Sequence, residues 1–339
     1  MKAIRLESVE NLALREVGDP EPGPGEMLVR VEASGVCGTD RHLLHGEFPS
    51  TPPVTIGHEF CGIVMKLGAG VTGFSTGQRI TADPNIVCGR CEACQAGRIN
   101  LCHNLRALGI HRDGGFATYA VVPQAQAYGL PANLKPEHGA FCEPIACCLH
   151  GIDLAQIPAG GSVAVLGGGV IGLLTVQLAR LAGARRVVLS TRQVARRRVA
   201  EDTGATATVD AAASDPVAAL TGPGGPLPGG ADVVFECAGV PDTMKQMTHM
   251  ARAGGTVVVL GVMPKGETVP WEPFDVLFRE LRVLGSFINP FTHRRAADLV
   301  AAGALALDPL ITRRMGLDEV PEVIRHPAAP GEVKAMAVA

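Results

Sequence analysis

Two short segments of the sequence carry side chains that bind metal ions. The first contains Cys37, and the second contains His58 followed directly by Glu59. A thiolate, an imidazole and a carboxylate are ligands that hold zinc in sites with one position open to water or substrate. The sequence therefore predicts a zinc centre built from both segments, although a single cysteine is often a core residue and a single histidine an ordinary polar one.

A second group of potential ligands is denser. Four cysteines lie between residues 88 and 102. Four thiolates fill the tetrahedral sphere of a zinc ion and leave no position for chemistry, so this group predicts a structural zinc site. The adjacent His103 is an alternative ligand, but the thiols suffice. They belong to Cys88, Cys91, Cys94 and Cys102.

A third candidate site is a run of glycines between an apolar strand, Ser162–Leu166, and a helical pattern that continues through Leu181. Glycines let the backbone turn tightly and approach a pyrophosphate, which lies at the helix N-terminus where free N–H groups favour anions. A second apolar strand follows at 186–189, so the context predicts a dinucleotide-binding turn. Its residues are Gly167, Gly168, Gly169, Val170, Ile171 and Gly172.

The end of that second strand indicates which dinucleotide binds. NAD sites usually place an Asp or Glu there to accept from the ribose, whereas this chain has Thr191 and Arg192. A threonine hydroxyl and an arginine can bind a 2′-phosphate, and Arg196 lies one helical turn further on. We therefore expect NADP to be favoured over NAD. The alternative is a solvated helix face made of Arg192, Arg196, Arg197 and Arg198.

The elements around these sites fall into different patterns. Residues 1–150 contain short alternating runs between Gly and Pro clusters, which is typical of a small β domain. Residues 151–285 alternate apolar strands with helical segments, which predicts an α/β, doubly wound parallel sheet. Residues 286–339 contain helical patterns at 294–302 and 317–324 and a short strand at 309–312.

Composition excludes several classes of function. The chain has 339 residues, 47% hydrophobic content and a net charge of -3, which gives no basic surface for nucleic acid or an anionic membrane. The most apolar run, 163–176, is interrupted by glycines and is shorter than the ~20 residues that span a bilayer. The N-terminus lacks the apolar core of a signal peptide, so a cytoplasmic location is expected.

Several motifs together resemble the zinc-dependent medium-chain dehydrogenase/reductase family of the alcohol dehydrogenase superfamily. They are Gly-Val-Cys-Gly-Thr-Asp at 35–40, Gly-His-Glu at 57–59, the four cysteines and Glu143-Pro144. The match covers nearly the whole chain and is closest to the polyol branch, which includes sorbitol and threonine dehydrogenases. It implies a GroES-like catalytic domain at 1–150, a Rossmann domain at 151–285, and a return of 286–339 to a catalytic domain that is therefore discontinuous.

The resemblance also assigns roles near the first zinc. Either Glu59 or Glu143 completes the zinc sphere in this branch, and the sequence leaves both open, with Cys142 a less favoured ligand. Thr39 and His42 correspond to the relay that carries the alcohol proton to solvent, chemistry that a hydroxyl and an imidazole can perform. The alternative is that these residues have no role at the zinc site. His42 is then a surface histidine, and Asp40 and Arg41 form an ordinary surface pair.

The expected function is an NAD(P)-linked oxidoreductase that interconverts a secondary alcohol and a ketone on a polyol, sugar or sugar acid. The family further implies a homodimer or homotetramer. One alternative is a non-catalytic dinucleotide-binding or sensor protein on the same fold. Another is a zinc hydrolase with Glu59 as general base, but it leaves the glycine turn unused.

Overall fold

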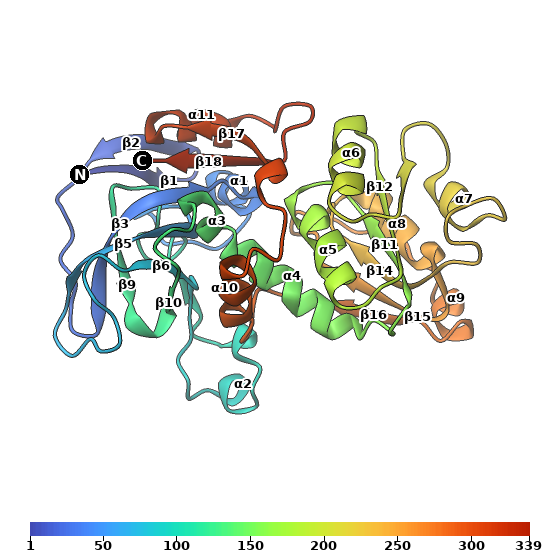
Figure 1. Cartoon of the computed structure of the whole chain (residues 1–339), viewed down its shortest axis with the longest axis horizontal. Helices are drawn as coiled ribbons and strands as arrows, with labels where there is room; N and C mark the ends of the chain where they lie inside the picture. The colour runs from blue at the N-terminus through green and yellow to red at the C-terminus, as the bar shows by residue number, and fades with distance from the viewer. The chain divides into compact units, whose positions relative to one another are not determined.

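The computed structural model describes residues 1–339 and divides them into two compact units. Unit 1 comprises Met1–Ala146 and Asn289–Ala339, and unit 2 comprises Cys147–Ile288. Unit 1 is therefore discontinuous, because its last segment follows unit 2 in the sequence (Figure 1). No helix in either unit has the length and apolar character needed to cross a membrane.

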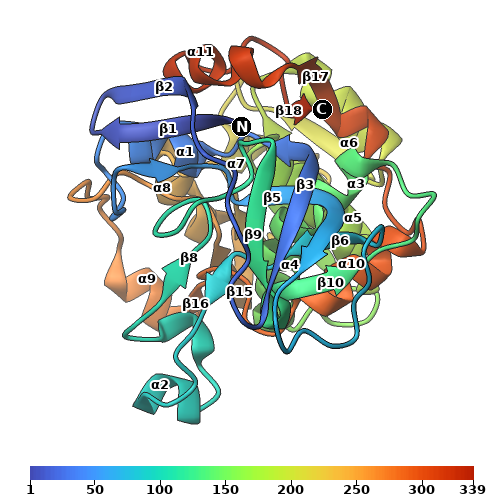
Figure 2. The same ribbon diagram turned by 90° about the vertical axis from the view of Figure 1, so that its left-hand side faces the viewer.

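Unit 1 is built mainly from antiparallel strands. Its largest sheet has seven strands, ordered β10-β6-β5-β3-β18-β17 with β9 also paired to β3. A three-stranded sheet, β2-β1-β4, and the pair β7-β8 complete it, and both chain termini lie in this unit (Figure 2). The strands are β1 (Lys2–Ser8), β2 (Asn11–Glu16), β3 (Glu26–Gly35), β4 (Val54–Thr55), β5 (Glu59–Leu67), β6 (Arg79–Ala82), β7 (Asn85–Ile86), β8 (Arg106–Ala107), β9 (Tyr119–Pro123), β10 (Ala127–Gly129), β17 (Ile311–Met315) and β18 (Lys334–Val338).

Alternation along β3 explains why this sheet forms. Met27, Val29 and Val31 are buried at every second position, as expected for a strand with one face on the core. They join Phe60 and Val64 of the neighbouring β5 region in one apolar cluster. The β3–β5 pair is therefore a rigid support for the residues at its ends.

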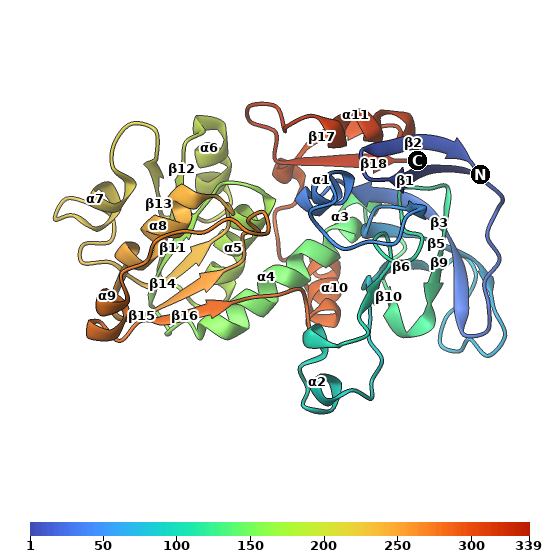
Figure 3. The same ribbon diagram turned by 180° about the vertical axis from the view of Figure 1, so that it is seen from behind.

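The helices of unit 1 are short. The loop that carries α2 extends away from the sheets in every view (Figures 1 to 3). The helix α4 begins in unit 1 and ends in unit 2. The α-helices are α1 (Gly38–Leu44), α2 (Glu92–Gln95), α3 (Pro136–Ala140), α4 (Cys142–Ala155), α10 (His293–Ala301) and α11 (Val320–Arg325), and the 3₁₀ turns are η1 (Ile99–Leu101), η2 (Gln124–Gln126), η3 (Asp308–Leu310) and η4 (Leu317–Glu319).

Two elements of the last segment differ from the sequence prediction. The strand predicted at 309–312 begins only at Ile311, because Pro309 lies in the turn η3 and has no N–H for a sheet. The helix predicted at 317–324 is divided into η4 and α11, and Pro321 lies in the first turn of α11. Proline is tolerated there but cannot continue a preceding helix.

Unit 2 is a doubly wound sheet of six parallel strands in the order β13-β12-β11-β14-β15-β16. This order is that of the Rossmann fold, and the predicted fold class is confirmed. Helices α5 and α6 pack on β12, and α8 packs on β14 and β15, so both faces are covered (Figures 1 and 3). The elements are β11 (Ser162–Leu166), α5 (Val170–Leu181), β12 (Arg186–Thr191), α6 (Val194–Asp202), β13 (Ala207–Asp210), α7 (Pro216–Thr221), β14 (Ala231–Glu236), α8 (Pro241–Met250), β15 (Ala251–Val259), α9 (Pro273–Phe278) and β16 (Arg282–Gly285).

Candidate functional site

The register of β3 on β5 brings the two metal-binding segments together. Gly35, the last residue of β3, pairs with Glu59, the first residue of β5. Cys37 follows β3 as the N-cap of α1, and His58 immediately precedes β5. As a result, ligand atoms of Cys37, His58 and Glu59 lie within 4.8 Å of one another. This donor set fits zinc.

The ends of the Glu59 and Lys334 side chains pack against Gly35. A Cβ atom added to Gly35 would lie 2.5 Å from Glu59 Oε2 and 2.6 Å from Lys334 Cε. Both contacts are shorter than real Cβ atoms show, so a side chain there would displace the groups beside the metal-binding set.

Lys334 is the partner of the Glu59 carboxylate. The two side chains form an ion pair and are each 1% exposed. Lys334 Nζ also donates to the backbone oxygen of Val36 at 2.8 Å. Burial by itself lowers the pKa of Lys334, but the charges of Glu59 and Cys37 outweigh it and raise that pKa. The lysine is therefore charged, and it holds the Glu59 carboxylate in place next to Cys37 and His58.

Asp40 links the other two members of the cluster. One carboxylate oxygen accepts from the Cys37 N–H at 2.8 Å, and the other lies 3.6 Å from His58 Nδ1. Burial lowers the pKa of His58, but Asp40 and Cys37 raise it more, and the result is a pKa well above the usual range. A carboxylate behind a ligating histidine fixes its ring orientation and raises its basicity.

The surface-pair interpretation of Asp40 and Arg41 is wrong. Asp40 is fully buried, and Arg41 donates instead to the backbone oxygen of Val323 at 3.2 Å. The three-residue spacing of Cys37 and Asp40 is that of a helix N-terminal capping pair, a local signal that could have indicated this role.

The other residues predicted near this site differ in how they are placed relative to Cys37, His58 and Glu59. Thr39 Oγ1 is 3.7 Å from Cys37 Sγ. His42 Nδ1 lies 2.5 Å from Glu47 Oε2, and both side chains reach solvent. Glu143 is buried in the first turn of α4 but is not among the three residues whose ligand atoms converge, nor is Cys142. Burial raises the pKa of the Cys142 thiol to about 12.

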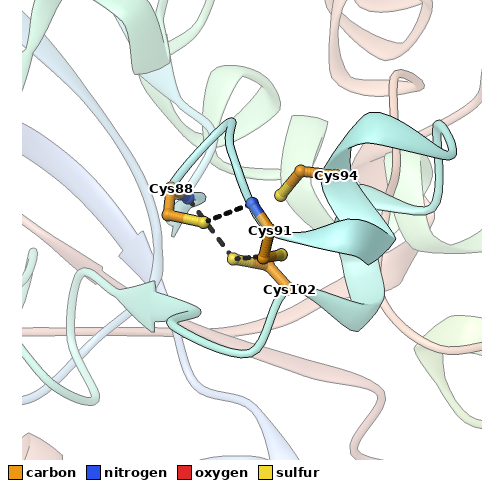
Figure 4. Close-up of side chains that lie close together, drawn as sticks. All are labelled: Cys88, Cys91, Cys94 and Cys102. Atoms are coloured by element: carbon orange, nitrogen blue, oxygen red, sulfur yellow. Dashed lines mark hydrogen bonds between the residues drawn. The ribbon is translucent and has the colours of Figure 1, made fainter.

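The four cysteines form a second cluster on the α2 loop (Figure 4). Their sulfur atoms lie within 4.8 Å of one another, and His103 is not part of the set. Backbone N–H groups of Arg90 and Cys91 lower the pKa of Cys88 to about 6, whereas desolvation and neighbouring thiols raise that of Cys94 to about 12. Four converging sulfurs with N–H groups aimed at them fit a structural zinc site.

The predicted dinucleotide turn joins β11 to α5 in unit 2. Gly167 has a φ of +108°, in the region that favours glycine, and Gly169 is the N-cap of α5. A Cβ atom on Gly172 would lie 1.9 Å from the Gly167 backbone oxygen. Only glycine at 172 lets the helix approach the turn this closely, as a pyrophosphate-binding turn requires.

A pocket of about 330 Å³ opens beside this turn, and Thr191, Arg192 and Arg196 line it. Arg192 forms an ion pair of 2.8 Å with Asp242, which also lines the pocket. Arg197 instead donates to the Thr191 backbone oxygen at 3.0 Å and pairs with Asp210 at 2.7 Å. The arginines therefore do not form one solvated face.

Sequence reasoning missed two charged residues, Lys334 and Asp242. Lys334 begins an apolar strand, and a lysine in such a run is the only local signal of its buried role. Nothing local distinguishes Asp242 from other acids in a first helical turn. Both are recognised only through partners far away in the sequence.

Comparisons with known protein families agree with both units. The family model described as alcohol dehydrogenase GroES-like domain matches residues 23–132, and the model described as zinc-binding dehydrogenase matches residues 170–302.

Individual proteins are similar along nearly the whole chain. An L-threonine 3-dehydrogenase of Xanthomonas campestris is 34% identical over 94% of both chains. A crystal structure described as a zinc-binding dehydrogenase from Sinorhizobium meliloti, bound to NADP, is 68% identical with a TM-score of 0.98, over 100% of this chain and 99% of that one. Galactitol-1-phosphate dehydrogenase from Escherichia coli is 27% identical with a TM-score of 0.89, and 100% of each chain is covered.

Proposed function

We propose, because the chain belongs to the zinc-dependent medium-chain dehydrogenase/reductase family, that this enzyme interconverts a secondary alcohol and a ketone on a polyol, sugar or sugar acid, with NADP favoured over NAD. Membership confirms the resemblance stated from the sequence motifs. The observation that carries the proposal is the convergence of Cys37, His58 and Glu59 at the ends of β3 and β5.

Cys37 and His58 would hold the catalytic zinc, with Glu59 and Glu143 as alternative further ligands. When bound, the zinc would supply polarisation of the alcohol oxygen and the nicotinamide would supply the acceptor for the hydride. Because Glu59 is also paired with Lys334, its carboxylate has two competing partners. Asp40 acts as a positioning residue, since it contacts both Cys37 and His58.

The alcohol proton needs a route to solvent when the carbonyl forms. The Thr39 hydroxyl lies next to the Cys37 thiol and can accept that proton while it donates its own. His42 lies three residues further along α1, with its Nδ1 held by the exposed Glu47. An imidazole that reaches solvent can pass a proton on to water. We assign Thr39 and His42 to this relay.

NADP is favoured by the residues at the end of β12. The strand ends in Thr191 with no acid, and Arg192 and Arg196 line the adjoining pocket. Two cations and a hydroxyl suit a 2′-phosphate, whereas NAD sites usually carry an acid here. The relative from S. meliloti, whose structure is described as bound to NADP, supports the same cofactor.

The non-catalytic alternative is less well supported, because a sensor has no need of a buried metal-ligand set with a positioned carboxylate behind it. The hydrolase alternative leaves the Gly167–Gly172 turn without a role. The cysteine cluster does not distinguish the dehydrogenase from the sensor or the hydrolase, because a structural zinc site is compatible with all three.

The test is the initial rate of nicotinamide reduction by the purified zinc-loaded protein. NADP⁺ and NAD⁺ are offered with polyols, polyol phosphates, sugars, aldonates and L-threonine. We expect a rate with one hydroxylated class, faster with NADP⁺, lost on zinc chelation and restored by zinc. Tight NADPH binding without turnover on any alcohol would favour the non-catalytic alternative, and a zinc-free but active Cys37→Ala variant would refute the proposed site.

A further inference from the structure

The pocket beside the glycine turn contains a carboxylate among its cations. Arg192 follows β12, and Asp242 lies in the first turn of α8, after β14. The strands β12 and β14 flank β11 on its two sides. The ion pair between Arg192 and Asp242, at 2.8 Å, therefore joins loops from opposite sides of the turn after β11.

The position of this pair matters because the same pocket must receive the adenosine end of the dinucleotide. A Cβ atom on Gly168 would lie 3.0 Å from the Thr191 side chain and 3.1 Å from Arg196 Cβ, so both residues border the glycine turn directly. Arg192 lines the pocket with them. A 2′-phosphate bound among these three residues would compete with Asp242 for the Arg192 guanidinium.

The ion pair between Arg192 and Asp242 can be broken at little cost in free energy. Side-chain exposure is 67% for Arg192 and 61% for Asp242, and an exposed ion pair contributes little to stability. By contrast, Arg197 is 15% exposed, and both Asp210 and the backbone of Thr191 hold it. Arg192 is therefore a pocket arginine whose partner can be replaced at small cost.

Asp242 also supplies a function that the end of β12 lacks. In NAD sites an acid accepts a hydrogen bond from the adenosine ribose, and here that position is Thr191. A carboxylate delivered from α8 into the same pocket can accept from a ribose 2′-hydroxyl. The same carboxylate repels a 2′-phosphate, which carries about two negative charges.

We propose that Asp242 is a specificity residue of the dinucleotide pocket. It holds Arg192 when no phosphate competes, it opposes binding of the 2′-phosphate of NADP, and it accepts from the ribose 2′-hydroxyl of NAD. Asp242 thus reduces the ratio of NADP affinity to NAD affinity. Thr191, Arg192 and Arg196 raise that ratio. The inference rests on the dinucleotide binding in the proposed function and not on the identity of the alcohol.

The test measures dissociation constants of NADPH and NADH by fluorescence titration of the zinc-loaded full chain without alcohol. Asp242→Asn should tighten NADPH about threefold and weaken NADH about threefold, a change of about tenfold in their ratio. Asp242→Ser, which also removes the charge, should act in the same direction. Asp202→Asn is the matched control, since Asp202 is an exposed acid at the end of α6 that does not line the pocket.

Two further measurements separate this role from a merely structural one. In competition experiments, Asp242→Asn should bind 2′,5′-ADP more tightly and 5′-AMP more weakly than the wild type does. These ligands contain only the adenosine end of the dinucleotide, so they test that end alone. In an Arg192→Gln background, Asp242→Asn should tighten NADPH less, since the arginine that it releases is gone. An unchanged NADPH-to-NADH ratio relative to Asp202→Asn, or equal changes for both cofactors, would overturn the proposal. Failure of the proposed dehydrogenation would instead appear as absent turnover with both binding constants measurable.

Discussion

Lys334 and Glu59 form an ion pair inside unit 1, with 1% of each side chain exposed. The lysine comes from β18 and the glutamate from β5, and β3 lies between these two strands in the sheet. Gly35 of β3 has no side chain, and the pair occupies the space beside it. The last strand of the fold therefore supplies the counter-charge of a residue in the metal-binding set.

Loss of the lysine should leave a buried carboxylate without its partner. We expect Lys334→Met to lower the free energy of unfolding by about 3–5 kcal/mol, because an unpaired buried charge is costly. Lys135→Met is the control, since its pair with Asp308 is more than half exposed and should contribute less than about 1 kcal/mol. Urea unfolding of both proteins after removal of zinc, which would otherwise offset the charge of Glu59, measures both effects. Adding Glu59→Gln should recover part of the loss. Equal effects of the two lysine variants would contradict this account.

Asp40 should control zinc affinity at one site alone. Asp40→Asn keeps an acceptor for the Cys37 N–H but removes the charge behind His58, so zinc affinity there should fall about tenfold to a hundredfold. Cys94→Ser should release the other zinc and spare this one. Zinc content after equilibration with graded chelator distinguishes the two losses. Retention of both ions by Asp40→Asn at every chelator concentration would exclude the positioning role.

The glycine turn should not tolerate even one methyl group at position 172. A Cβ atom there would lie 1.9 Å from the Gly167 oxygen, and overpacking of this kind costs about 1–3 kcal/mol. We expect Gly172→Ala to lower the melting temperature and to weaken NADPH binding at least about tenfold. Gly224→Ala, where nothing lies within 4 Å of the added atom, is the control. Normal NADPH binding by Gly172→Ala would disprove the close approach.

Stability in unit 1 should depend on pH through His293. Its ring is buried, 4.9 Å from that of Tyr128, and burial followed by the charge of Arg294 lowers its pKa from 6.5 to about 3. Between these pH values the unfolded chain binds a proton that the folded chain does not. The histidine's contribution is therefore complete above pH 6.5 and is lost as pH falls, by roughly 1.4 kcal/mol per pH unit at most.

The measurement compares the wild type with His293→Phe, which keeps a ring against Tyr128 but cannot titrate. Denaturant unfolding at several pH values between about 4 and 7 gives the two slopes. The variant should lose less stability than the wild type over this window. Parallel pH profiles would mean that His293 does not titrate as its burial implies.

Local patterns predicted the parts of the molecule that depend on neighbouring residues. The apolar strand before Gly167 and the helix after it indicated the doubly wound unit, and the spacing of the four cysteines indicated one cluster. The ends of short elements were less predictable: β17 starts at Ile311 because Pro309 cannot donate to a sheet.

Contacts between distant segments were not predictable in this way. Lys334 meets Glu59 only because β18 pairs with β3, and Arg192 meets Asp242 only because β12 and β14 flank β11. Neither ion pair can be recognised from a local sequence pattern. The number of residues between its two members depends on the order of the strands in the sheet and not on helical or strand periodicity. Asp40 is an intermediate case: its three-residue spacing from Cys37 signals a capping role, but its complete burial depends on packing.

The discontinuity of unit 1 has a consequence for biosynthesis. Residues 147–288 leave the ribosome before β18 does, so unit 2 has all of its own residues while unit 1 still lacks two strands of its main sheet. Domains generally fold as units during synthesis. The edge of β3 that β18 covers stays unpaired in the nascent chain. Glu59 has no Lys334 to pair with until β18 has been synthesised. Premature termination just before β18 would yield a chain with an intact dinucleotide unit and an exposed sheet edge, a product for chaperones and proteases to remove.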